Sequence, residues 1–208
     1  MKTEPRLIPA EAVKGIASGL FMMAAFTMIW AGIAFGGLHN SPYAFALVVF
    51  AVLAITFVTR GISIYKLAKH FPNVESEEDK AEGKKMGMWF GIIFGLEGLF
   101  IFIAVNVVIN IGHPELTIPA IALIVGLHFY PLAKVFKRNV DYYLATWSTL
   151  VAIAAILLSL NKVLSQPGVM AFTGIGLAVA TSCYGLYMTN EGKKLAKQVT
   201  PGVVLNGE

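Results

Sequence analysis

The sequence predicts an all-α membrane protein with six transmembrane helices and both termini in the cytoplasm. Three observations lead to this fold class: the composition, the length of six apolar runs, and the placement of the positive charges. Of the 208 residues, 57% are hydrophobic and 13% are charged, and the mean hydropathy is +0.71. Soluble domains carry about 25% charged residues. The composition therefore indicates a protein whose solvent is largely the lipid bilayer.

Six apolar runs are each long enough to cross a membrane. A hydrocarbon core of roughly 30 Å requires about 20 apolar residues in a helix. The runs cover approximately residues 15–38, 43–65, 86–111, 118–135, 142–160 and 169–188. Because these runs and their short connections use nearly the whole sequence, we expect one transmembrane domain spanning residues 1–208.

The positive charges give the expected orientation. Nearly all of them lie before the first run, between the second and third, between the fourth and fifth, or after the sixth, and only Lys162 lies on the other side. By the positive-inside rule, the side that carries most of the Lys and Arg is cytoplasmic. This placement also accounts for the sequence pI of about 9.1 without a nucleic-acid partner. The residues on the predicted cytoplasmic side are Lys2, Arg6, Lys14, Arg60, Lys66, Lys69, Lys80, Lys84, Lys85, Lys134, Lys137, Arg138, Lys193, Lys194 and Lys197.

The third run carries a carboxyl group at membrane depth. Glu97 lies roughly opposite a stripe of small and polar residues on the same helix. A glycine stripe favours close packing of a second helix, and an intramembrane carboxyl requires protein or water around it. We therefore expect both faces to be covered, which would make this the central helix of the bundle. The stripe consists of Gly87, Gly91, Gly95, Gly98, Asn106 and Asn110.

Two roles for Glu97 remain open from the sequence. In the structural role, a neutral carboxyl forms a hydrogen bond to a neighbouring helix. In the functional role, the same group is a site for a proton or a cation.

The fourth run contains the other unusual stretch, in which His128, Tyr130 and Pro131 interrupt apolar residues. Proline lacks the N–H that would bind the carbonyl of Leu127, so a bend is expected there. With a rise of about 1.5 Å per residue, Glu97 lies about 16 Å from the cytoplasmic edge and His128 about 9 Å. Side chains on adjacent helices could bridge that offset directly or through one water. Alternatively, His128 is a packing residue that is bound to a backbone carbonyl.

Two further charged residues belong to the candidate binding set. Arg60 lies near the inner end of the second run and either extends to the interface or faces the bundle. Asp141 begins a narrow stripe of small and polar residues on the fifth run. With Glu97, His128, Tyr130, Asn106 and Asn110, they form the complete set of candidate binding residues.

A possible internal repeat is visible in the sequence. Leu-Ala-Lys occurs at 67–69, 132–134 and 195–197, each time after a run directed towards the cytoplasm. This spacing suggests three tandem helical hairpins, and repeats of this kind are frequent in transporters. The alternative is coincidence, because these residues are common at helix ends.

Motifs for known catalytic or cofactor chemistry are absent from the sequence. There is no phosphate-binding glycine loop, no His-Glu-x-x-His and no Gly-x-Ser-x-Gly. Cys183 is the only cysteine, so a disulfide within the chain is excluded. We therefore expect no cofactor, no metal and no catalytic residue of an established type.

The segment at 126–133, Gly-Leu-His-Phe-Tyr-Pro-Leu-Ala, is followed by Asp-Tyr-Tyr at 141–143. It resembles a pattern in uncharacterised small bacterial six-helix integral membrane proteins. The similarity covers the fourth run and the start of the fifth. It implies location in the bacterial inner membrane and implies no activity.

Three functional hypotheses follow, in this order of preference. The first is a transporter or channel for small solutes or ions, with Glu97 and His128 as a polar site beside Pro131. The second is a non-catalytic module that binds lipid, a second copy of itself or a partner membrane protein through its small-residue stripes. The third is an intramembrane enzyme in which the same pair acts as acid and base on a lipid-soluble substrate. A hydrated cavity would favour the transporter or channel. A dry interior with an exposed apolar face would favour the binding module. A pocket that opens sideways to lipid would favour the enzyme.

Overall fold

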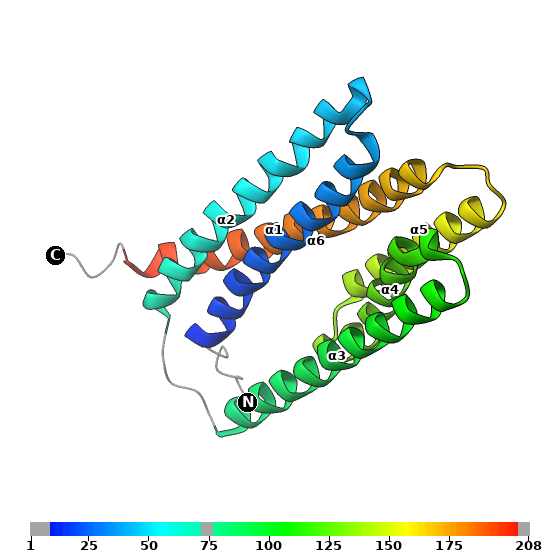
Figure 1. The fold of residues 1–208 in the computed structure, drawn as a ribbon. Helices are drawn as coiled ribbons and strands as arrows, with labels where there is room; N and C mark the ends of the chain where they lie inside the picture. Colours follow the sequence, from blue (N-terminus) through cyan, green and yellow to red (C-terminus); the bar gives the residue numbers. More distant parts are fainter. Residues whose placement is uncertain (1–8, 72–76, 204–208) are drawn as a thin grey trace.

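The computed structural model describes residues 9–71 and 77–203, with side chains described as far as residue 196. The described residues form helices and no strands, and six of the helices are long and apolar enough to span a membrane. This confirms the predicted class of a six-helix membrane protein. Figure 1 shows the arrangement. The helices are α1 (Ala10–Leu38), α2 (Val48–Leu67), α3 (Glu77–Asn110), α4 (Thr117–Phe136), α5 (Asn139–Leu160) and α6 (Gln166–Val203), with short 3-10 helices η1 (Pro42–Leu47), η2 (Ala68–His70) and η3 (Pro114–Leu116).

Some helices extend beyond the apolar runs that predicted them. Helix α3 begins at Glu77, whereas its apolar run begins near residue 86. The added turns are charged, and the first of them carries Glu77, Glu78 and Asp79. Acidic side chains at the start of a helix are favoured because they face the positive end of its dipole.

The two ends of the bundle differ in charge. We define the basic end as the end at which α1 begins and α4 finishes. Among the described residues, Lys162, between α5 and α6, is the one lysine or arginine at the opposite end. Lys2 and Arg6 lie outside the described residues. The other described Lys and Arg residues lie towards the basic end: Lys14, Arg60, Lys66, Lys69, Lys80, Lys84, Lys85, Lys134, Lys137, Arg138, Lys193 and Lys194.

The helices form two groups of three. Helices α1, α2 and α6 pack together, and α3, α4 and α5 form the second group (Figure 1). Glycine permits the closest approach in each group. A Cβ atom on Gly174 would lie 2.5 Å from the backbone nitrogen of Ala34, and one on Gly126 would lie 2.7 Å from that of Thr149. The α1–α6 and α4–α5 pairs are therefore the tightest helix contacts of the fold.

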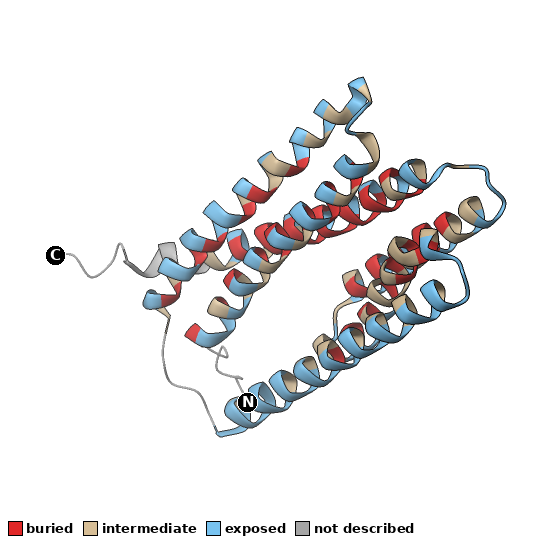
Figure 2. Ribbon diagram, in the orientation of Figure 1, coloured by how far each residue is buried: buried red, intermediate tan, exposed pale blue. Residues whose placement is uncertain are grey.

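Helix α6 is the central helix, so the expectation that α3 would be central is wrong. In the membrane-spanning window of α6, 67% of the residues are buried, against 11% in α3. Figure 2 shows α3 exposed along most of its length. A Cβ atom added to any glycine of its stripe would meet nothing within 4 Å. The side chains of Asn106 and Asn110 donate to carbonyls one turn earlier on their own helix, at 2.7 and 2.8 Å.

The two groups are joined along the contact of α5 with α6, from Leu144 near the basic end to Trp147 and Val151 further along the bundle. The indole nitrogen of Trp147 on α5 donates to the carbonyl oxygen of Gly176 on α6 at 2.9 Å. A buried apolar cluster, which we call the sealing cluster, fills the space between the groups at this level. It comprises Trp30, Ala31, Phe50, Ala122, Val151, Ala152, Leu177 and Ala178.

The bend at Pro131 and the three tandem hairpins were both predicted from the sequence. Helix α4 runs without interruption through Pro131, whose side chain is exposed, so the predicted bend stays a prediction. The three tandem hairpins also stay a prediction. Consecutive helices do pack on each other, but α6 packs more extensively on α1 than on α5.

Candidate functional site

A deep groove separates the two helix groups in the basic half of the bundle. We call it the central groove. Its volume is about 1240 Å³, and α1 and α3 form its walls while α4, α5 and α6 form its floor. It extends from Glu11 and Lys84 at the basic end to Trp30 and Ile101 near mid-height. At its deep end the groove reaches Trp30, which belongs to the sealing cluster.

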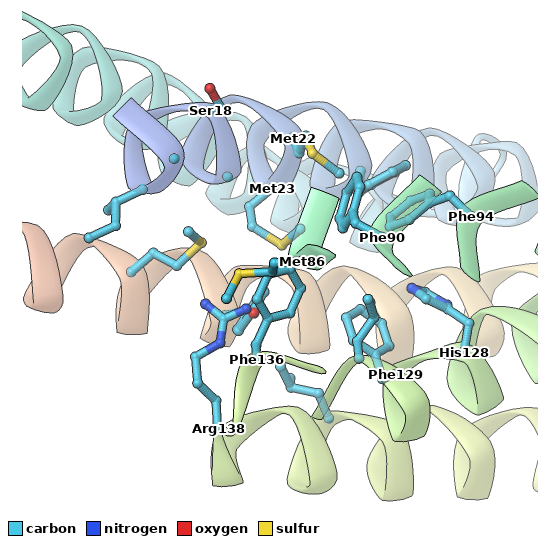
Figure 3. Close-up of a pocket in the computed structure, with 18 of the residues that line it drawn as sticks. Ser18, Met22, Met23, Met86, Phe90, Phe94, His128, Phe129, Phe136 and Arg138 are labelled. Atoms are coloured by element: carbon cyan, nitrogen blue, oxygen red, sulfur yellow. The ribbon is translucent and has the colours of Figure 1, made fainter. Parts of the chain in front are cut away.

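Phenylalanine and methionine line much of the central groove. Figure 3 shows their side chains projecting into a common space from α1, α3 and α4. Methionine is unbranched and polarizable, so it adapts to ligands of different shape. The lining therefore favours a bulky apolar molecule. The labelled residues of this kind are Met22, Met23, Met86, Phe90, Phe94, Phe129 and Phe136.

Glu97 and His128 meet on the wall of this groove, where α3 packs on α4. Oε1 of Glu97 lies 3.4 Å from Nδ1 of His128, and the two side chains are 12% and 8% exposed. The separation is longer than an ordinary N–H···O hydrogen bond, for which about 2.9 Å is typical. The structure thus brings together the two ionisable residues singled out in the third and fourth apolar runs.

Aromatic rings surround this pair. The His128 ring lies edge-on to Phe94, with centroids 5.4 Å apart, and close to Phe129 at 4.3 Å. Phe90 stacks in a tilted manner on Phe94 at 4.4 Å. The Val125 carbonyl, on the preceding turn of α4, is a further polar neighbour of the imidazole. The pair is therefore a polar spot within an aromatic wall.

A second, smaller groove lies on the other side of the α3–α4 contact. We call it the side groove. Its volume is about 550 Å³, and its lining includes Trp89 and Phe100 from α3 and Pro131 from α4. Glu97 and His128 line both grooves. The pair therefore forms part of the partition between the interior of the bundle and its lateral surface.

A further polar cluster lies near the mouth of the central groove. Nε of Arg138 lies 3.3 Å from Oδ2 of Asp141, which is fully buried. The guanidinium carbon lies 4.4 Å from the centroid of the Phe136 ring and 5.6 Å from that of Tyr184. The carboxylate of Asp141 also interacts with Tyr184. Asp141, a predicted binding residue, is therefore placed behind Arg138 and away from Glu97.

Arg138 and Tyr184 line the groove but were not among the predicted site residues. Arg138 was interpreted from the sequence only as a charge that orients the chain. The spacing of three residues between Arg138 and Asp141, at the start of a helix, was an available signal for their pairing. Tyr184 had no comparable local signal, because it comes from α6.

Four other predicted site residues lie away from the pair. Arg60 is exposed on α2, and the hydroxyl of Tyr130 lies 3.2 Å from that of Thr146 on α5. Asn106 and Asn110 are exposed on α3, bound to their own helix. The structure thus brings together Glu97 and His128 and leaves these four residues outside the central groove.

Two hydroxyl groups complete the polar lining at depth. The Thr27 hydroxyl donates to Thr181 at 2.9 Å, and Thr181 lines the groove floor. The buried Ser148 hydroxyl also lines the groove and has no hydrogen-bond partner within the described part of the chain. Among the described residues, no three His, Cys, Asp or Glu side chains gather closely enough to hold a metal ion.

The arrangement can hold a large apolar molecule beside one carboxyl and one imidazole group. Its chemistry rests on this geometry, since no protein-family model, curated protein or solved structure matches the chain.

Proposed function

We propose that this polytopic membrane protein is a transporter of small solutes in which Glu97 and His128 form the polar site. The observation that supports the proposal best is the shape of the central groove. It runs from the basic end past the pair to the sealing cluster. Transporters that work by alternating access bind their substrate near mid-height of the membrane, between two helix groups.

The proposed orientation of the protein places its basic end on the cytoplasmic side. The basic end lies in the cytoplasm, because Lys and Arg near the ends of transmembrane helices are retained on that side. The central groove then faces inward. The pattern at 126–133 favours the bacterial inner membrane as the location.

The two helix groups supply the moving parts. Helices α1 and α3 are the opposite walls of the groove, and each belongs to a different group. Closure of the basic end requires one group to rotate against the other about the sealing cluster, which is the rigid-body motion found in many transporters. The same rotation opens a path from the opposite end to Glu97.

A distance measurement between the groups tests this motion. Ala12 on α1 and Gly83 on α3 are exposed residues on the two walls of the groove. In a Cys183→Ser background, both are changed to cysteine, spin-labelled, and measured by pulsed electron resonance in lipid nanodiscs. We expect two distance populations whose ratio changes between mildly acidic and mildly alkaline pH, because Glu97 gains or loses a proton.

The matched control uses Ala12 with Lys69 instead of Gly83. Both control residues belong to the first group, where η2 packs on α1, so their distance should have one value at every pH. Glu97→Gln should remove the pH dependence of the Ala12–Gly83 ratio. A single, pH-independent distance between Ala12 and Gly83 would contradict transport by this motion.

A second candidate function, binding of a partner transmembrane helix, is favoured by the open glycine stripe of α3. A Cβ atom at Gly91 or Gly95 would meet nothing within 4 Å, and small residues permit close approach of another helix. Light scattering of the solubilised protein tests this function. Gly91→Leu with Gly95→Leu should reduce the mass of the assembly if the stripe is an interface, and should leave it unchanged otherwise.

The geometry supports an intramembrane enzyme less well. An acid and a base that act on one substrate flank the reacting group. Here Oε1 of Glu97 and Nδ1 of His128 are 3.4 Å from each other, which leaves no room for a substrate atom between them.

A further inference from the structure

We infer that the central groove binds lipophilic organic cations. This inference rests on the proposed transport function and names its substrate class. Three features carry it: the charge of the deep part of the groove, the aromatic rings around that charge, and the size and flexibility of the lining.

The deep part of the groove has an unbalanced carboxyl group. Among the described residues that line the groove beyond its mouth, Glu97 is the one acidic residue. No lysine or arginine lines this deep part. At the mouth, the charge of Arg138 is offset by Asp141, at 3.3 Å. A carboxylate at membrane depth requires a counter-charge, so the ionised form of Glu97 favours a cationic ligand.

The groups that face Glu97 do not supply this counter-charge permanently. Helix α4, the element packed against α3 at this depth, presents His128 at 3.4 Å. A neutral imidazole leaves the carboxylate unbalanced. Lys134 lies further along α4 and lines only the side groove with Glu97. Helix α1 presents apolar side chains across the groove at this level, including Met22 and Phe26.

The rings beside Glu97 are suited to a cation. Phe90, Phe94 and Phe129 line the groove around the pair, with the ring centroids of Phe90 and Phe94 4.4 Å apart (Figure 3). A cation within about 6 Å of an aromatic face is attracted by the negative potential of that face. The protein already uses this interaction at the groove mouth, where the Arg138 guanidinium lies 4.4 Å from the Phe136 centroid.

The size of the groove distinguishes organic cations from metal ions. Its volume of about 1240 Å³ exceeds the roughly 300–1,000 Å³ of most small-molecule sites. A small inorganic cation such as Mg²⁺ or Ca²⁺ requires about six or more oxygen ligands at short distance. The apolar walls do not provide such a shell at Glu97. They suit a ligand with a large apolar body and a diffuse positive charge.

Charge balance links binding to proton movement. The Glu97 carboxyl carries either a proton or, once ionised, the ligand cation beside it. Binding of one cation to the protonated carboxyl therefore breaks its O–H bond and releases one proton to water. The direction of exchange is a cation against a proton, and cation affinity should rise with pH.

Tetraphenylphosphonium and tetraphenylborate provide the test, because they have nearly the same size and shape and opposite charge. Binding of each is measured by equilibrium dialysis with the full chain in lipid nanodiscs, with empty nanodiscs subtracted. We expect saturable binding of tetraphenylphosphonium, weaker binding of tetraphenylborate, and release of one proton per bound cation.

The variants identify the carboxyl that is responsible. Glu97→Gln should weaken tetraphenylphosphonium binding by about tenfold or more, because a desolvated charge contact is lost. Glu97→Asp keeps the charge and should retain most of the affinity. Glu115→Gln, at the opposite end of the bundle, is the matched control and should have no effect. Phe94→Leu should weaken binding severalfold, because it removes one ring while keeping an apolar side chain.

Two results would overturn the inference: tetraphenylborate binding as tightly as the phosphonium, or unchanged phosphonium binding by a folded Glu97→Gln protein. If Glu97→Gln does not fold, a failure of Glu97→Asp to bind the phosphonium contradicts it instead. The transport proposal is judged separately by the Ala12–Gly83 distances. Two distance populations without phosphonium binding overturn the substrate class alone, and binding with a single distance overturns transport alone.

Discussion

Glu97 on α3 and His128 on α4 place a carboxylate oxygen 3.4 Å from an imidazole nitrogen, at the contact between the least buried helix and its main neighbour. This contact serves both the candidate site and the packing of the two helices. The pair faces the central groove, and it also supplies polar attraction between two helices whose other contacts are largely apolar.

A double-mutant cycle should detect this attraction. We expect Glu97→Gln and His128→Gln each to lower the free energy of unfolding, and the double variant to lose less than the sum. The expected coupling is about 0.5–1.5 kcal/mol, typical of contacting polar side chains. It is measured by reversible unfolding in mixed detergent micelles. Strictly additive losses would show that the two groups do not interact.

Glycine substitutions should separate helix interfaces from open faces. Gly174→Ala places a Cβ atom 2.5 Å from the backbone nitrogen of Ala34, so we expect a loss of about 1–3 kcal/mol from overpacking. Gly95→Ala meets nothing within 4 Å and should be neutral or slightly stabilising, since alanine favours helix more than glycine. Thermal unfolding in detergent measures both. Equal losses would contradict the described packing of α1 on α6.

Removal of Arg138 should be costly because its partner is buried. Arg138→Gln leaves the Asp141 carboxylate, whose side chain is 1% exposed, without its counter-charge. We expect a loss of about 3–5 kcal/mol, as for other broken buried ion pairs.

The matched variant combines Arg138→Gln with Asp141→Asn. It removes both charges and should recover most of the lost stability, because no uncompensated charge remains. Unfolding in mixed micelles again gives the values. If the double variant is as unstable as Arg138→Gln alone, then packing of the guanidinium on Phe136 and Tyr184 stabilises this region, and charge pairing does not.

Labelling of single cysteines should establish the orientation. In a Cys183→Ser background, Lys162→Cys and Lys69→Cys lie at opposite ends of the bundle and are both exposed. In intact cells, a membrane-impermeant maleimide should modify position 162 and should reach position 69 only after permeabilisation. The reverse pattern would place the mouth of the central groove outside the cell.

The number of helices was predictable because run length is a direct physical requirement of the bilayer. The contact between Glu97 and His128 could be predicted for a similar reason. Helical rise fixes the depth of each residue, and consecutive helices are usually neighbours. These predictions needed no knowledge of which helix face packs on which partner.

The position of α3 was not predictable from its glycine stripe. Such a stripe indicates that a helix can approach closely, but it does not say whether any helix of the same chain does so. Close contacts are made instead by Gly174 and Gly126, each opposite backbone atoms of another helix. Likewise, the contact of Arg138 with Tyr184 depends on tertiary packing of α6, which local spacing does not encode.

The sparse packing of α3 affects how the protein assembles. A helix that buries 11% of its membrane-spanning window gains little from docking, so its detachment should be the lowest-energy partial unfolding of the fold. We expect α3 to exchange its amide hydrogens ahead of α6 and to dock last during folding in the membrane. Because Glu97 resides on α3, the polar site would be completed only in that final step.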